Sequence, residues 1–185
     1  MRKILTVAIS GFAALSISAG EVSEAAKKLA AESEAKCEAT ASTKPTPVMI
    51  KEKVAKAVTL IEKEGSKAFA KFKGKDSEFL FAGTYIWIND MNGVMLMHPI
   101  KPGMENSELL GLKDSNGKRF FVEMIDVCKK QGAGWVDYMW PKPGEKERSL
   151  KVSYVKKAMC DGKPVILGCG VYDISLEEIK KAEGQ

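Results

Sequence analysis

The residues with the most potential for chemistry lie in an aromatic segment, Gly134–Pro141, whose sequence is GWVDYMWP. A strand over this segment places Tyr138 and Trp140 on one face, because successive side chains alternate. Pro141 ends the strand, since it has no N–H to donate. Aromatic rings with polar tips line many ligand pockets, but such rings are also common in the core of any small sheet. The strand pattern alone leaves both interpretations open.

Lys151 and Tyr154 follow in a second alternating segment, predicted as a strand over residues 150–158. A lysine inside a strand points either to solvent or into a pocket, where it can bind a carboxylate by charge and hydrogen bond. Because Lys151 and Tyr154 are three residues apart, a regular strand places them on opposite faces, and only a bulge or twist brings both to one pocket. The neighbouring lysines favour a solvated side chain when spacing alone is considered.

His98 is the only histidine of the chain, so the sequence contains no histidine cluster for a metal ion. It ends a predicted strand just before Pro99, where it is either a structural hydrogen-bonding residue or a ligand contact. No G-x-S-x-G motif, phosphate-binding loop or H-E-x-x-H motif occurs. The sequence therefore predicts no enzyme, no metal site and no cofactor.

The composition fits one compact domain with some extension: 185 residues, of which 45% are hydrophobic. The charge is mildly basic, with 29 Lys and Arg against 24 Asp and Glu, and the lysines are spread along the chain. No arginine-rich stripe occurs, so nucleic-acid binding is not predicted. A net charge of +5 fits a protein that handles small anions equally well.

Residues 1–20 have the three-part design of a secretory signal peptide. Met1-Arg2-Lys3 is positively charged, Ile4–Ile17 is apolar, and the small residues Ser18-Ala19-Gly20 offer a cleavage site. The alternative is an uncleaved membrane anchor, but the apolar run is shorter than the ~20 residues that span a bilayer. We therefore expect cleavage near Ala19 or Gly20 and a mature protein in an extracytoplasmic space, most simply the periplasm of a bacterium.

An oxidising compartment permits disulfide bonds among the cysteines, and no C-x-x-C spacing indicates thiol redox chemistry. Cys160 and Cys169 flank a predicted hairpin and are candidates to lie near each other. Cys128 lies on the apolar stripe of a predicted helix, which favours a buried, free thiol. The pairing among Cys37, Cys128, Cys160 and Cys169 stays open.

The chain begins with helical segments and continues with strands. Residues 21–40 predict a helix with a weak, alanine-rich face, which the prolines of residues 42–47 interrupt. A second helical pattern covers residues 48–72, with Gly65 as a stop or kink. Strands are predicted over 84–89 and 94–98, which an Asn92-Gly93 turn joins, and over 134–141, 150–158 and 165–172; helices are predicted over 119–130 and 175–181. This order predicts the α+β class, an antiparallel sheet with helices gathered on one side.

Taken in this order, the motifs resemble those of the single Cache domains of type 2. The resemblance covers residues 48–174, which gives four divisions: signal peptide (1–20), helical extension and linker (21–47), Cache domain (48–174) and C-terminal tail (175–185). It is carried by the hairpin Tyr85–Pro99 (YIWINDMNGVMLMHP), by Leu109–Lys118, by Gly134–Pro143, by Lys151 with Tyr154–Lys156, and by Gly168–Tyr172.

The resemblance implies a PAS-like antiparallel sheet with a long N-terminal helix packed along it. It also implies an extracytoplasmic sensor of short carboxylates, such as acetate, propionate, pyruvate or lactate. Lys151 would then supply the cation, Tyr138 and Tyr154 hydroxyl donors, and Trp140 an apolar lid. The full set of implied ligand-binding residues is Tyr85, Trp87, His98, Tyr138, Trp140, Lys151 and Tyr154.

Members of this family often form the outer part of chemoreceptors or histidine kinases. The chain ends soon after Tyr172, so we expect a binding protein without its own signalling module, acting through a membrane receptor or kinase partner. A homodimer is left open. The alternatives are a structural or interaction protein whose pocket is filled by side chains and, third, a secreted enzyme acting through His98 and Lys151.

Overall fold

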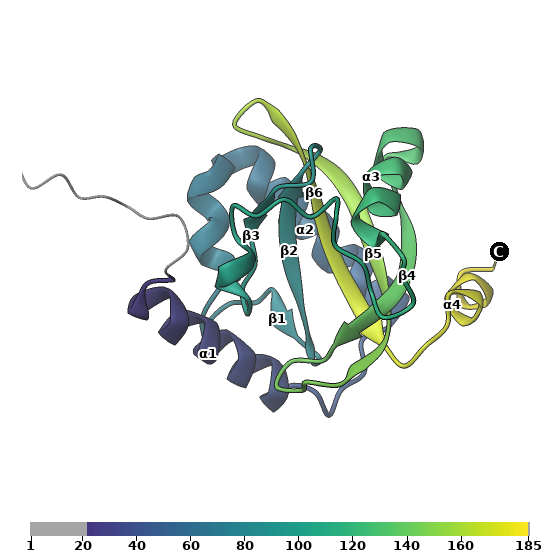
Figure 1. Ribbon diagram of the computed structural model, residues 1–185, viewed down its shortest axis with the longest axis horizontal. Helices are drawn as coiled ribbons and strands as arrows, with labels where there is room; N and C mark the ends of the chain where they lie inside the picture. The colour runs from purple at the N-terminus through teal and green to yellow at the C-terminus, as the bar shows by residue number, and fades with distance from the viewer. Residues whose placement is uncertain (1–21, 185) are drawn as a thin grey trace, which may run out of the picture.

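The computed structural model describes residues 22–184, which fold into one antiparallel sheet covered by helices (Figure 1). The predicted signal peptide lies outside the described residues. Within residues 22–184, no helix is long and apolar enough to cross a membrane.

The two N-terminal helices are α1 (Glu24–Ala39) and α2 (Pro47–Glu64), and both were predicted from the sequence. Thr46 caps α2 by accepting a hydrogen bond from the Met49 N–H, with Pro47 in the first turn. Gly65 ends α2 with a φ of 62°, a conformation that favours glycine, and the 3-10 helix η1 (Gly65–Phe72) follows. The predicted stop at Gly65 is therefore confirmed.

The sheet has the strand order β1-β2-β6-β5-β4, with β3 also paired to β2. Antiparallel pairing of β2 with β3 confirms the predicted Asn-Gly hairpin. β1 was not predicted, because the turn of its hairpin is Ala82-Gly83, which lacks the Asn-Gly or Asp-Gly signal although both residues have positive φ. The bounds are β1 (Leu80–Phe81), β2 (Thr84–Asp90), β3 (Met95–Met97), β4 (Ala133–Pro141), β5 (Arg148–Cys160) and β6 (Lys163–Tyr172).

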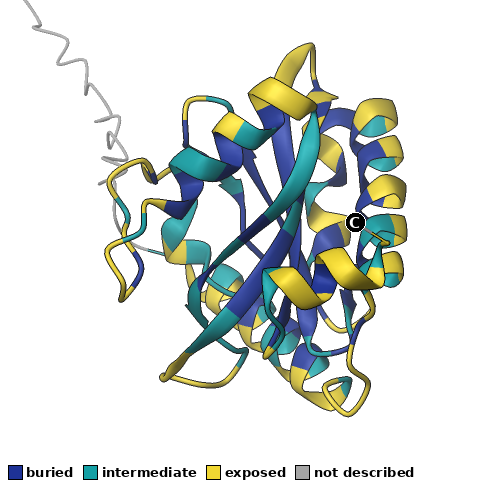
Figure 2. Ribbon diagram, turned by 90° about the vertical axis from the view of Figure 1, so that its right-hand side faces the viewer, coloured by how far each residue is buried: buried dark blue, intermediate teal, exposed yellow. Residues whose placement is uncertain are grey.

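Helices cover both faces of the sheet, so the prediction that they gather on one side is wrong (Figure 2). One face packs against α2, η1 and α4 (Leu176–Ala182); the other packs against α1, α3 (Phe120–Gln131) and the chain that leads from β3 to α3 through η2 (Pro102–Met104). The physical reason is visible in β2, where every residue from Thr84 to Asn89 is buried. A strand that is apolar on both sides needs cover on both sides.

The two faces of the sheet carry different side chains. The face that packs against α2 is called the α2 face, and the face that carries Lys151 is called the lysine face. The α2 face carries aliphatic residues from the three central strands, among them Ile86, Val152 and Leu167. The lysine face carries Lys151 together with aromatic residues, among them Tyr85. Because side chains alternate along each strand, β2, β5 and β6 each contribute to both faces.

All four cysteines lie within the described residues, and each is a buried, free thiol. In the register of β5 and β6, Cys160 is opposite Lys163 beside the turn, whereas Cys169 is opposite Tyr154, farther from the turn. The six residue steps from Lys163 to Cys169 correspond to about 20 Å of strand, so Cys160 and Cys169 are not neighbours. Burial raises the pKa of the Cys128 thiol to about 12, in agreement with its predicted place on the buried stripe of a helix.

Candidate functional site

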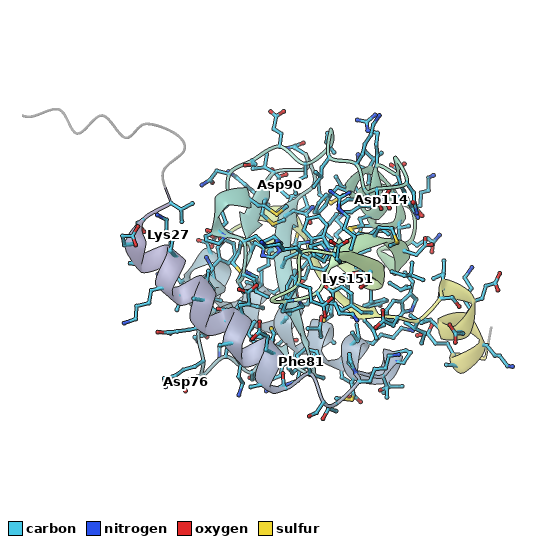
Figure 3. All side chains as sticks on the ribbon, turned by 60° about the horizontal axis from the view of Figure 1, so that its bottom comes forward. Lys27, Asp76, Phe81, Asp90, Asp114 and Lys151 are labelled. Carbon is cyan, nitrogen blue, oxygen red and sulfur yellow. The ribbon has the colours of Figure 1, made fainter. Side chains whose placement is uncertain are left out.

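Lys151 lies in the interior of the protein, with none of its surface exposed (Figure 3). Its ammonium nitrogen lies 4.2 Å from the ring centre of Tyr85, 4.8 Å from that of Tyr172 and 5.3 Å from that of Trp87. Among residues 22–184, no side chain or backbone group hydrogen-bonds to this nitrogen. Burial lowers the pKa of Lys151 to about 7. Lys151 is therefore a buried amine that is surrounded by aromatic rings, has no hydrogen-bond partner among the described residues, and is about half protonated near pH 7.

Strand register places these groups together. Lys151 is opposite Tyr138 on β4 and opposite Tyr172 on β6. A side chain at Gly170 would collide with Lys151, since a Cβ atom there would lie 2.5 Å from the lysine Cε. Because Gly170 has no side chain, the Lys151 side chain can lie over β6 at this position.

The aromatic side chains around Lys151 are tied down by hydrogen bonds. The Trp87 indole N–H donates to Asn89 Oδ1 at 3.2 Å, and the Tyr172 hydroxyl donates to the Pro141 carbonyl at 3.0 Å. The Trp140 indole N–H donates to the Tyr85 hydroxyl at 3.0 Å. Since Tyr85 is the acceptor in that bond, its own hydroxyl proton can be donated to another group.

Tyr138 adds a second hydroxyl on this face. Its oxygen lies 3.0 Å from the Ser153 Oγ, and either group can be the donor. Its ring stacks on Phe120 from α3, with centroids 4.4 Å apart and an interplanar angle of 5°. Burial raises the pKa of Tyr138 well above its usual value, so the hydroxyl stays protonated.

His98 is buried and held in one tautomer. Its Nδ1 accepts hydrogen bonds from the backbone N–H groups of Ile100, at 3.2 Å, and Lys101, at 2.9 Å. Burial lowers the pKa of His98 well below its usual value, so the ring is neutral. An acceptor at Nδ1 leaves the proton on Nε2, which makes that nitrogen a donor.

The aromatic residues, His98 and two methionines enclose a small cavity on the lysine face. Its volume is about 10 Å³, room for about one water molecule. Trp140 and Met104 are half-buried, so they separate the cavity from solvent. The lining residues are Tyr85, Trp87, Met95, His98, Met104, Phe120, Phe121, Tyr138 and Trp140.

The structure brings six of the seven residues predicted for ligand binding to the lysine face. Five line the cavity, and Lys151 contacts the rings of two of them. Tyr154 lies on the α2 face instead, where its ring packs 5.2 Å from that of Trp135. β5 pairs in regular register from Lys151 through Tyr154, so no bulge turns Tyr154 toward Lys151.

Tyr172, Ser153 and Phe120 also lie on the lysine face but were not among the residues predicted to bind a ligand. Tyr172 lies in a segment that was assigned to a strand, but its place opposite Lys151 depends on the β5–β6 register. Alternation from Lys151 puts Ser153 on the lysine face, a signal that was present in the sequence. Phe120 lies in a segment that was predicted as a helix, but its stacking on Tyr138 depends on tertiary packing.

This arrangement suits the binding of a small anion among apolar rings. The lysine face offers one ammonium group, one imidazole N–H and tyrosine hydroxyls as donors, all enclosed by apolar rings. Across the described part of the chain, no group of three or more His, Cys, Asp or Glu side chains could hold a metal ion.

Two curated receptors match this chain over 88 residues, 48% of its length. The methyl-accepting chemotaxis protein McpP of Pseudomonas putida is 41% identical, and the match covers 16% of that receptor. The sensor histidine kinase MctS of Rhizobium johnstonii is 30% identical, and the match covers 18% of that kinase. The chain therefore corresponds to a small part of each of these proteins.

Solved structures are also similar. A Cache chemosensory domain, described for its recognition of carboxylic acids, is 45% identical over 49% of this chain and 60% of that chain, with a TM-score of 0.46. A periplasmic sensor domain of a chemotaxis protein is 27% identical over 82% of this chain and 90% of that chain, with a TM-score of 0.47. A methyl-accepting chemotaxis protein of Vibrio parahaemolyticus has the same fold, with a TM-score of 0.54 at 23% identity over 69% of this chain and 85% of that chain.

The family model of single Cache domain 2 matches residues 18–183. This match covers every helix and strand of the structure. The chain therefore belongs to the single Cache domain 2 family.

Proposed function

We propose that this protein is an extracytoplasmic binding domain for a short organic acid of the acetate, propionate, pyruvate or lactate class. The acid binds on the lysine face, with its carboxylate at Lys151. The observation that carries this proposal is the fully buried ammonium group of Lys151, which has no hydrogen-bond partner among the described residues.

The energetics of burial support an anionic ligand. A buried cation without a partner is costly, because it has lost the water that solvated it. The surrounding aromatic rings recover part of this cost by cation–π contact but offer no hydrogen-bond acceptor to the ammonium group. A carboxylate supplies both the opposite charge and the missing acceptors.

The neighbouring donors support the same class of ligand. A carboxylate has two oxygens and accepts several hydrogen bonds. The Tyr85 hydroxyl keeps a proton that it can donate, and the His98 Nε2 carries one as well. Together with Lys151, these groups supply the hydrogen-bond donors that a carboxylate accepts. A hydroxyl or keto oxygen next to the carboxylate would hydrogen-bond to Tyr138 or Ser153.

The small cavity supports a ligand of few carbon atoms. About 10 Å³ is less than even acetate needs, so binding requires side chains to move. Met104 is flexible and half-buried, and Trp140 is held at its ring nitrogen by a single hydrogen bond, to Tyr85. Outward movement of these two side chains opens the site to solvent while the strands stay in place.

The relatives support the proposal by analogy. A Cache chemosensory domain that is 45% identical over about half of this chain is described for carboxylic acid recognition. The matched receptors are a chemotaxis protein and a sensor kinase, which fits a signalling partner of the receptor or kinase class. Chemical cross-linking in cells, with and without the acid, tests for this partner and for a homodimer.

Calorimetry with acetate, propionate, pyruvate and lactate tests the proposal. We expect at least one acid to bind the wild-type protein, and Lys151→Met to weaken that binding more than about 100-fold, since loss of a buried charge–carboxylate hydrogen bond costs about 3 kcal/mol or more. Lys157→Met, at an exposed position on the same strand, is the matched control and should bind like the wild type. Equal binding by the Lys151 and Lys157 variants would contradict the proposal.

The cavity volume favours a second candidate, a structural protein whose pocket is filled by its own side chains. In that case no acid raises the melting temperature, and Lys151→Met stabilises the protein without loss of any binding. The two candidates thus differ in one thermal-shift experiment on the wild-type protein.

A further inference from the structure

A second cluster that combines a cation with aromatic rings lies on the α2 face. Trp135 of β4 and Tyr154 of β5 pack with ring centroids 5.2 Å apart. Lys51 of α2 places its ammonium nitrogen 5.5 Å from the centre of the Tyr154 ring. These are the chemical groups that also surround Lys151, but they face the opposite side of the sheet.

This cluster already binds a carboxylate, the one of Glu183. The Trp135 indole N–H donates to both carboxylate oxygens of Glu183, each at 3.2 Å. The Lys51 ammonium group lies 2.5 Å from one of them. The Glu183 side chain is only 11% exposed, whereas that of Lys51 is 40% exposed. The carboxylate is therefore enclosed more than its cationic partner.

The stability of α4 does not explain the position of the Glu183 side chain. Glu183 is the C-cap of α4, where a negative charge opposes the helix dipole. α4 is held in place by other residues: Ile179 is fully buried, and Ser175 forms a capping box with Glu178. What stabilises the Glu183 carboxylate at this end of the helix is its contact with Trp135 and Lys51.

A cleft lies beside this contact. Its volume is about 360 Å³, within the range of small-ligand sites. Besides the carboxylate, it offers an indole, a phenol ring and two lysines. The residues that line it include Lys51, Val127, Gln131, Trp135, Tyr154 and Lys180.

We propose that Lys51, Trp135 and Tyr154 form a second carboxylate-binding site, which Glu183 occupies as an internal ligand. A carboxylate from outside, either of a free acid or of an acidic side chain, must displace Glu183 to bind. Because Glu183 is tethered next to the site, its effective concentration is on the order of millimolar or higher, and weak ligands do not compete. The site thus becomes available where Glu183 is removed or outcompeted.

The test uses the Lys151→Met background, so that the lysine face is silent and the result does not depend on the proposed function. The probe is acetate, and the readout is the NMR signal of the Trp135 indole N–H, assigned with Trp135→Phe. We expect acetate to shift this signal after Glu183→Ala, and at least tenfold more acetate to be needed when Glu183 is present. Glu177→Ala, an exposed change in the same helix, is the matched control and should leave Glu183 in the site.

Lys51→Met in the Glu183→Ala protein should abolish the acetate shift, because it removes the cation of the site. A short Asp-rich peptide forms the second arm: tighter binding than acetate would assign the site to protein carboxylates, and weaker binding to small acids. Circular dichroism checks that α4 keeps its helix, as the burial of Ile179 predicts. No Trp135 shift after Glu183→Ala, or a shift that survives Lys51→Met, would overturn the proposal.

Discussion

The two faces of the sheet are built from the same strands but differ in what they bury. The α2 face is packed almost entirely by aliphatic and aromatic side chains, such as Ile86 and Leu167. The lysine face buries Lys151, Ser153 and His98 together with its aromatic rings. Polar groups in a core cost stability unless they are satisfied, whereas each large aliphatic side chain contributes about 1.5–3 kcal/mol when buried.

Within one sheet, the residues of the α2 face therefore contribute mainly to fold stability, and those of the lysine face to ligand binding. Alternation along β5 sends Val152 to the α2 face, which stabilises the fold, and Lys151 to the lysine face, which offers a charge. The same alternation separates Tyr154 from Lys151. We therefore expect substitutions on one face to act mainly on unfolding, and those on the other to act mainly on ligand affinity.

The largest effect on stability is expected for Leu167→Ala. Leu167 is fully buried on the α2 face, so its truncation leaves a cavity and should lower the free energy of unfolding by about 2–5 kcal/mol. Urea denaturation measures this change. Acid affinity of the folded fraction should stay within about twofold of the wild type; a loss of affinity as large as that of Lys151→Met would mean that the faces are not separate.

Gly170→Ala should weaken acid binding by about 10- to 100-fold, because its methyl group meets the Ser153 hydroxyl and the Lys151 stem and displaces both without removing the charge. Overpacking should also lower the free energy of unfolding, by about 1–3 kcal/mol. Calorimetry at a temperature where the variant is folded measures the affinity. Gly111→Ala is the matched control, since a side chain there meets no atom within 4 Å. Unchanged affinity in Gly170→Ala would show that the lysine position does not matter.

The pH dependence should have opposite signs for affinity and stability. Burial lowers the pKa of Lys151 from 10.5 to about 7, so above pH 7 a proton must be taken up when a carboxylate binds. Affinity should fall by up to about tenfold per pH unit there. Between about pH 7 and 10.5 the unfolded chain binds more protons, so the Lys151 contribution to the stability of the ligand-free protein rises with pH. Calorimetry and urea denaturation across this range measure both, with Lys151→Met as the reference that lacks only the titration of Lys151.

The smallest effects are expected for a matched pair of tyrosines. Tyr85→Phe removes a donor next to Lys151 and should weaken acid binding by about 3- to 10-fold. Tyr154→Phe makes the same chemical change on the α2 face, where Glu183 already occupies the neighbouring carboxylate site, so it should leave the acid affinity of the lysine face unchanged. Titrations of both variants in parallel decide the comparison; a larger loss in Tyr154→Phe would reverse it.

Periodicity predicted much of the fold but little of the neighbourhood of Lys151. Alternation and the Asn92-Gly93 turn were enough to predict β2, β3 and β4. The positions of proline and glycine were enough to predict where α2 begins and ends. The contact of Lys151 with Tyr172 depends on which residues of β5 and β6 are opposite each other, and a period of two does not give that register.

Tyr154 shows how two sources of prediction can disagree. The resemblance to Cache domains placed it with Lys151, whereas strand alternation placed the two residues on opposite faces. The structure follows alternation, because β5 is regular between them. That helices cover both faces of the sheet was also not predicted, because the burial of consecutive residues in β2 depends on helices that are distant in sequence.

The most direct test of the central claim is the titration of Lys151 itself, followed by NMR of labelled lysine side chains and assigned with Lys151→Met. Without ligand, the Lys151 signal should titrate near pH 7. With a saturating acid that binds the protein, a carboxylate next to the ammonium group should raise this pKa by about 1–3 units. A Lys151 pKa that stays the same while the acid binds would contradict the account, because the carboxylate would then lie elsewhere.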